Sequence, residues 1–176
     1  MLILPKHFDE NEWFIILIIL LSTILFKLPK RFPASITILI LLLSVAIPKI
    51  IDHSIAAISP YDFYRLNDSE KFEVFDLMLD GAYLPFGYLC IYFYDIFLPK
   101  GFQIVLYILV WSVFAVSFEF ICTNLHVFTY HGWQLIYSFP TYITVISLFL
   151  SFYACIHYYY KKTKKTNEGL SNERVF

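Results

Sequence analysis

The sequence has little charge, few cysteines and none of the common catalytic signatures. Charged residues make up 15% of the 176 residues and the net charge is −1, whereas soluble domains carry about 25% charged residues. The three cysteines lie far apart in apolar runs, so the sequence supports neither a disulfide framework nor a zinc site. The P-loop, GxGxxG, HExxH and nucleophile-elbow patterns are absent. Because there is also no basic stripe, we expect no nucleic-acid partner.

Long apolar runs are what the sequence has instead. Hydrophobic residues make up 59% of the chain, and a helix needs about 20 consecutive residues to cross a bilayer. We therefore predict an all-α protein, a polytopic integral membrane helical bundle with a single transmembrane domain over residues 1–160. Its five predicted spans cover residues 13–28, 34–51, 81–98, 102–122 and 137–160. A basic cytoplasmic tail, residues 161–176, follows and is expected to be disordered.

The acidic segment before the third predicted span has a helical pattern of its own. Asn67 and Glu70 resemble a capping box, which predicts a helix that begins near Ser69. Apolar residues then recur at helical spacing up to Leu79, while acidic residues gather on another face. The pattern predicts a short amphipathic helix over residues 69–80, which lies on the membrane surface or leads directly into the third span.

Basic residues are shared unequally between the two sides that five spans define. One side holds Lys27, Lys30, Arg31, Lys100, Lys161, Lys162, Lys164, Lys165 and Arg174. The other side holds only Lys6, Lys49, Arg65 and Lys71. Because cytoplasmic loops are enriched in Lys and Arg, we predict a plasma-membrane protein with its N-terminus outside and its C-terminus in the cytoplasm. The outer side is then acidic and carries His7, His53, His126 and His131.

The candidate functional residues centre on Glu119, a carboxylate inside an apolar run. An ionised carboxylate there needs a partner, and intramembrane carboxylates are functional candidates. The rise of a helix places Glu119 about 26 Å from the start of the fourth span, near its outer end. Residues expected at a similar depth complete a polar cluster: Glu119, Asp80, Asp76, His126 and His131.

This polar cluster has two interpretations. As a functional site it is an outward-facing pocket that binds a divalent cation or passes protons, since carboxylate and imidazole are suitable ligands. As a structural feature, Glu119 accepts hydrogen bonds from Tyr, Trp or backbone groups, and the histidines are ordinary loop residues. His126 and His131 are five residues apart, not the three or four that place two ligands on one helix face. We therefore assign no metal and no cofactor.

A second intramembrane carboxylate, Asp95, lies near the cytoplasmic end of the third predicted span. Because Glu119 lies near the outer end of the fourth span, we expect no contact between the two residues. Asp95 is a functional candidate on the same ground as Glu119. The structural alternative is that Asp95 reaches the headgroup layer and pairs with Lys100, Lys27 or Arg31.

Three aromatic stretches carry a resemblance to known proteins: GWQLIYSFPTYI (Gly132–Ile143), FEF around Glu119, and YDIF (Tyr94–Phe97). In these stretches the chain resembles a family of small, uncharacterised multi-pass membrane proteins of Bacillus-type and clostridial spore-forming bacteria. The resemblance implies a Gram-positive plasma-membrane protein and no particular biochemical activity. A membrane Glu followed by an aromatic loop and another span is also similar to the lycopene-cyclase type of carotenoid enzyme, whose proline-acid motif is missing here.

The missing catalytic signatures favour a non-enzymatic membrane component. Such a component is either a small-solute or ion permeation element, or a subunit of a complex whose partners are other membrane proteins and the lipid bilayer. The alternative is a membrane-embedded enzyme that acts on an isoprenoid or lipid, with Glu119 or Asp80 as general acid or base.

Overall fold

The computed structural model describes residues 8–52, 63–67 and 74–173, which form helices and a small sheet. In chain order the elements are α1 (Glu10–Ser22), the 3-10 helix η1 (Thr23–Lys27), α2 (Ala34–Ile51), β1 (Tyr64–Leu66), α3 (Val74–Phe97), α4 (Phe102–Asn124), β2 (Phe128–Tyr130) and α5 (Leu135–Glu173). Within the described residues, four helices are long and apolar enough to cross a membrane: α2, α3, α4 and α5 up to Thr166. This confirms a helical protein suited to a membrane. The count of five spans stays a prediction, because α1 has only 13 residues.

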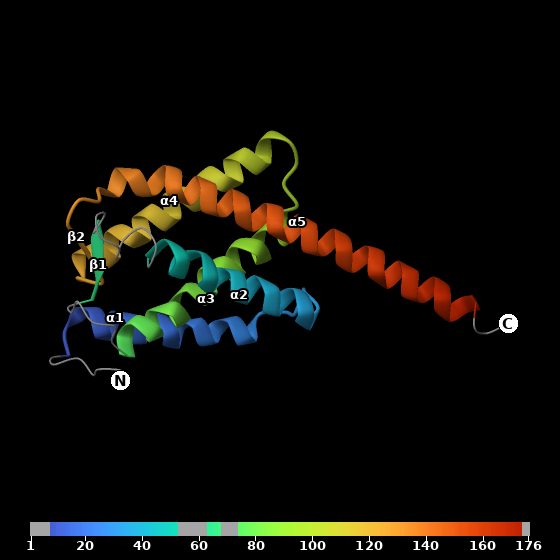
Figure 1. The fold of residues 1–176 in the computed structure, drawn as a ribbon, viewed down its shortest axis with the longest axis horizontal. Coiled ribbons are helices and arrows are strands. Elements are labelled where there is room, and N and C mark those ends of the chain that lie inside the picture. Colours follow the sequence, from blue (N-terminus) through green and yellow to red (C-terminus); the bar gives the residue numbers. More distant parts are fainter. Residues whose placement is uncertain (1–7, 53–62, 68–73, 174–176) are drawn as a thin grey trace.

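The helices run up and down, so their connections gather at two ends of the bundle. Figure 1 shows the α1–α2 turn, the α3–α4 turn and the C-terminal part of α5 at one end, and β1, β2 and the start of α1 at the other. α2 packs chiefly against α3, α4 against α5, and α1 against α3. The sheet end therefore collects segments that are far apart in the sequence.

The second span has the predicted bounds, and the described part of the helix predicted before the third span leads directly into that span. Residues 74–80 are the first turns of α3, and residues 69–73 lie outside the described residues. Phe75, Leu79 and Ala82 continue one buried face across Gly81. Because that face packs without interruption, the helix runs on through the glycine, in agreement with the alternative in which the predicted helix leads directly into the third span.

The last helix is longer than predicted. α5 continues to Glu173, through most of the segment that was expected to be a disordered tail. Figure 1 shows this part projecting beyond the other helices. No proline follows Pro140, and the lysines of residues 161–165 have high helix propensity, so the helix of the last span can propagate into the polar segment.

The core divides into two apolar clusters. One lies toward the sheet end and includes Ile15, Phe75 and Val127. The other lies toward the opposite end and includes Ile40, Ile91, Phe149 and Leu150. Between them α2, α3 and α5 approach closely.

Gly87 makes this close approach possible. A Cβ atom at Gly87 would lie 2.0 Å from the Ser44 Oγ and 2.8 Å from the Phe149 ring. Since real Cβ atoms do not come so near to other atoms, the three helices can keep this spacing only with glycine at position 87.

Candidate functional site

A two-stranded sheet joins two distant segments at one end of the bundle. β1 and β2 are antiparallel, and Tyr64 lies directly opposite Tyr130. Opposed residues place their side chains on the same face of a sheet, and the centroids of these two rings are 6.4 Å apart. The sheet thus presents two phenol groups side by side.

Tyr64 holds the carboxylate of Asp52, the residue that directly follows α2. The Tyr64 hydroxyl donates a hydrogen bond to Asp52 Oδ1 at 2.6 Å, and the Tyr83 hydroxyl from α3 donates to Oδ2 at 2.9 Å. Asp52 is only 7% exposed. Each oxygen of this buried carboxylate therefore has a phenolic donor, which offsets the loss of hydration.

Tyr130 holds the second carboxylate, Glu119 of α4, which is 8% exposed. The hydroxyls of Tyr130 and Ser138 both donate to Glu119 Oε1, the serine at 2.7 Å. The indole nitrogen of Trp133 in turn donates to the Ser138 oxygen at 2.8 Å. A chain of donors from the β2–α5 connection thus fixes the Glu119 side chain.

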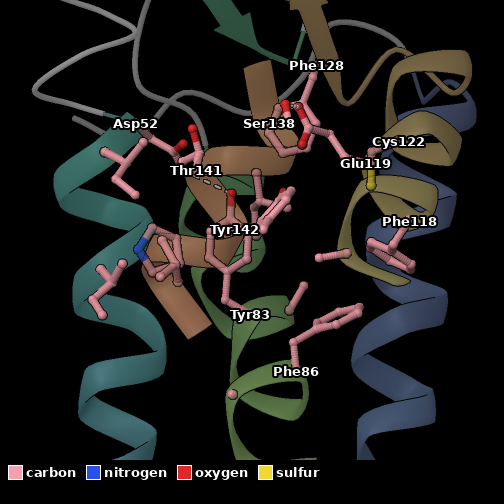
Figure 2. Close-up of a pocket in the computed structure, with 18 of the residues that line it drawn as sticks. Asp52, Tyr83, Phe86, Phe118, Glu119, Cys122, Phe128, Ser138, Thr141 and Tyr142 are labelled. Carbon is pink, nitrogen blue, oxygen red and sulfur yellow. Dashed lines mark hydrogen bonds between the residues drawn. The ribbon is translucent and has the colours of Figure 1, made fainter. Parts of the chain in front are cut away.

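Asp52 and Glu119 both line a cavity of about 190 Å³ inside the bundle. Figure 2 shows Asp52 on the α2 side, Glu119 on the α4 side and Tyr142 of α5 between them. The Tyr142 phenol interacts electrostatically with both carboxylates. Most of the other walls are apolar side chains of the five α-helices. The cavity is therefore an apolar chamber with an acidic end.

The environment keeps both sheet tyrosines in the neutral form. Burial raises the pKa of Tyr64 above its usual value of 10.0, and the adjacent Asp52 carboxylate raises it further. Burial also raises the pKa of Tyr130, and the hydrogen bond and charge of Glu119 add to that effect. A phenol with a raised pKa keeps its proton, so both residues remain donors at neutral pH.

The other carboxylates of the predicted polar cluster are engaged elsewhere. Asp80 forms an ion pair with Lys49 of α2. Asp76 is buried and accepts a hydrogen bond from Asn67 Nδ2 at 2.7 Å. Neither residue lines the cavity, so Glu119 is its only carboxylate from the predicted cluster.

The two histidines of the predicted cluster also lie away from the cavity. Both side chains are exposed, and His126 occupies a turn after α4 with a φ of 56°. In the part of the chain that the structure describes, no group of three His, Cys, Asp or Glu side chains could hold a metal ion. The structure therefore does not assemble the cation pocket that the sequence suggested.

Asp95 lies near the other end of α3 and takes part in a different contact. Arg31 Nε donates to its Oδ2 at 2.8 Å, and the Tyr153 hydroxyl donates to its Oδ1 at 2.7 Å. Arg31 was one of the three partners expected from the sequence. The contact joins the α1–α2 turn to α3 and α5, which gives Asp95 a structural role.

Sequence reasoning missed Asp52, Tyr64 and Tyr130 as site residues. Asp52 stands at the edge of an apolar run, where a charge normally marks a solvated helix end. The two tyrosines lie in short strands of three residues each, which leave almost no pattern. One signal could have found Asp52. It is an acidic residue directly after the second predicted span, on the same predicted outer side as Glu119.

Comparison of the chain with protein families, with curated proteins and with solved structures found no match. The chemistry of the site must therefore be read from its geometry. Two carboxylates at one end of an apolar chamber can accept hydrogen bonds or stabilise a positive charge, and the walls can bury hydrocarbon. This combination is suited to an amphiphilic small molecule.

Proposed function

We propose that the protein is a non-enzymatic integral membrane component that binds a small amphiphile in the cavity between Asp52 and Glu119. The amphiphile has a head that donates hydrogen bonds or carries positive charge, such as an amine or a hydroxyl, and an apolar body. The observation that carries the proposal is the pairing of Tyr64 with Tyr130, since it holds two buried carboxylates at the end of one apolar cavity. Buried carboxylates are stable only with donors, and a ligand head can add to those present.

Binding is better supported than permeation through the chain. A permeation path for a polar solute needs polar groups along its whole length. Below the cavity, toward the far end of the bundle, the described residues pack in an apolar cluster that includes Ile40, Ile91, Phe149 and Leu150. That packing favours a pocket that is closed at one end.

The proposal includes five spans, with the N-terminus outside and the C-terminus in the cytoplasm. Thirteen α-helical residues of α1 and five 3-10 residues of η1 together extend about 30 Å, which matches the hydrocarbon thickness of a bilayer. The basic turn around Lys30 and the lysines of α5 then lie on the cytoplasmic side. The Gram-positive plasma membrane stays a prediction from the sequence resemblance.

Native mass spectrometry of the purified protein tests the proposal. We expect the wild type to retain an amphiphile through purification, whereas Asp52→Asn and Glu119→Gln retain roughly ten- to a hundredfold less, as expected for loss of a charge-assisted hydrogen bond. Glu119→Gln keeps an oxygen that can accept from both Tyr130 and Ser138, and Asp52→Asn keeps one oxygen for Tyr64 or Tyr83. Each variant therefore retains an acceptor in the hydrogen-bond network, and we expect both to fold. Glu10→Gln, at an exposed carboxylate of α1, is the control. Equal retention in all four proteins would overturn the proposal.

A catalytic role is the second candidate, and the same two carboxylates favour it. In an apolar cavity one carboxyl group can donate a proton and another can accept one, as general acid–base catalysis requires. An isoprenoid or lipid is then the substrate. Lipid extracts that do not differ between deletion and overexpression strains would exclude this alternative.

A further inference from the structure

A second apolar hollow lies on the bundle beside the cavity. It runs between α1–η1 on one side and α4 on the other, over α3, and includes Leu25, Leu89 and Val110 in its lining. Among the described residues that line it, only Ser22 has a polar side chain apart from the indole of Trp111, and the Ser22 hydroxyl donates to the Ile18 carbonyl at 2.7 Å. We call this hollow the lateral groove. It offers hydrocarbon contacts but no unused hydroxyl.

The lateral groove and the cavity share a wall. Ile18, Phe86, Trp111, Phe114 and Phe118 line both spaces. The Phe86 and Phe118 ring centroids are 4.4 Å apart, and Phe86 lies 6.2 Å from Phe114. Figure 2 shows Phe86 and Phe118 next to each other at the edge of the cavity, away from Asp52. The wall shared by the cavity and the lateral groove therefore consists of side chains that can change rotamer.

The volumes of the cavity and the lateral groove indicate which part of a ligand each space can hold. The cavity measures about 190 Å³, and an apolar protein cavity of about 150 Å³ accommodates a benzene molecule. By that comparison the cavity alone holds roughly seven to eight non-hydrogen atoms, which is a head group and a chain of about six carbon atoms. A longer hydrocarbon chain must pass through one of the cavity walls. The lateral groove, with a volume of about 710 Å³, lies on the other side of the shared aromatic wall.

We propose that the lateral groove holds the hydrocarbon tail of a long-chain lipid amphiphile that enters from the bilayer with its head between Asp52 and Glu119. The inference rests on the proposed amphiphile site and adds the ligand class and its route. α3, which forms the floor of the groove, and α4, which forms one side, are among the helices apolar enough to lie in a membrane, so bilayer hydrocarbon is the phase that meets the groove. Phe86 and Phe118 rotate to join the two spaces.

Amines with hydrocarbon chains of different length test the lateral groove separately from the cavity site on which the inference rests. Hexylamine fits in the cavity alone, whereas hexadecylamine needs the groove. The plugging variants are Leu25→Trp and Val110→Trp, which fill the groove from opposite sides. The control is Val113→Trp, on the same helix as Val110 and equally exposed, which lines neither space. Affinity for each amine is measured with the whole chain in detergent, and all four proteins face the same micelle.

We expect both plugging variants to bind hexadecylamine at least tenfold more weakly than the wild type and the control, with hexylamine affinity unchanged in all four. Equal hexadecylamine affinity in the four proteins, with hexylamine bound, would overturn the groove and leave the cavity site intact. Failure of the wild type to bind either amine would overturn both. A loss of hexylamine binding in the plugging variants alone would also contradict the groove, because the plug would then act on the cavity itself.

Discussion

At the scale of single residues, the account depends on phenols that hold buried carboxylates. The clearest case is the hydrogen bond from Tyr130 to Glu119. Because Ser138 still donates to the same oxygen, Tyr130→Phe leaves Glu119 partly satisfied rather than bare. We predict that Tyr130→Phe lowers the free energy of unfolding by about 1.5–3 kcal/mol, the usual range for a hydrogen bond to a charged group.

Denaturant titration in detergent measures this change, with Tyr137→Phe, an exposed tyrosine of α5, as the control. Adding Glu119→Leu to the wild type and to Tyr130→Phe completes a double-mutant cycle. Leucine removes both acceptor oxygens, so the cycle isolates the Tyr130–Glu119 pair from effects of the lost hydroxyl elsewhere. A coupling energy near zero would mean that the two side chains do not interact as described.

Residues differ in how far the sequence reveals them. Glu119 was found because a charge inside an apolar run is costly and therefore conspicuous. Asp52 was not found, because its burial depends on Tyr64 and Tyr83, which approach it from other segments. Asp76 and Asp80 lie on a helical face that looked simply acidic, and only the packing of α3 assigns them to Asn67 and Lys49.

At the scale of elements, the contact between α2 and α3 depends on Gly87. Gly87→Ala places a methyl group against Ser44 and Phe149, and we predict a loss of about 1–3 kcal/mol in the free energy of unfolding from overpacking. Gly81→Ala is the matched control on the same helix, because nothing lies within 4 Å of its Cβ position. That control should gain about 0.5–1 kcal/mol from helix propensity.

Adding Ser44→Ala to Gly87→Ala should recover part of the loss, because the nearest clashing atom is the Ser44 hydroxyl oxygen. Thermal unfolding of the purified proteins gives the ranking. If Gly87→Ala were as stable as Gly81→Ala, the close approach of the helices would be disproved.

Element bounds could be predicted where prolines and charges mark them. α2 begins directly after Pro33 and ends at Ile51, directly before Asp52, and both marks are visible in the sequence. No such mark separates residues 74–80 from the third span, or the fifth span from residues 161–173, because helical packing or propensity continues through polar residues. The strands escaped prediction because their pairing joins residues 64–66 to residues 128–130, a contact that depends on the finished bundle.

At the scale of the whole molecule, the account predicts that the sheet end faces outward. Single cysteines at His131 and Thr163, in a background without Cys90, Cys122 and Cys155, report on the two ends. On intact cells a membrane-impermeant thiol reagent should label position 131 and leave position 163 unlabelled. Labelling of position 163 alone would invert the topology and place the cavity near the cytoplasm.

Composition alone predicted that the molecule is helical and suited to a membrane. It did not predict where the ends of the helices come together to form the acidic site. The charge asymmetry predicted an acidic outer side on which any carboxylate could join a site. The way in which α2, α4 and α5 converge beneath the sheet decides which carboxylates belong to the site. This convergence depends on tertiary packing, which cannot be read from a single sequence.

The central claim is that the cavity has an acidic head site, and head-group preference tests it most directly. Hexylamine, hexanol and hexanoate have tails short enough for the cavity and differ only in the head. We predict that the melting temperature of the detergent-purified protein rises most with hexylamine, less with hexanol and not with hexanoate, since a ligand stabilises the folded state according to its affinity. The difference between amine and carboxylate should shrink in Asp52→Asn and Glu119→Gln but not in Glu10→Gln. Equal shifts with hexylamine and hexanoate, or a preference that persists in both cavity variants, would contradict the account.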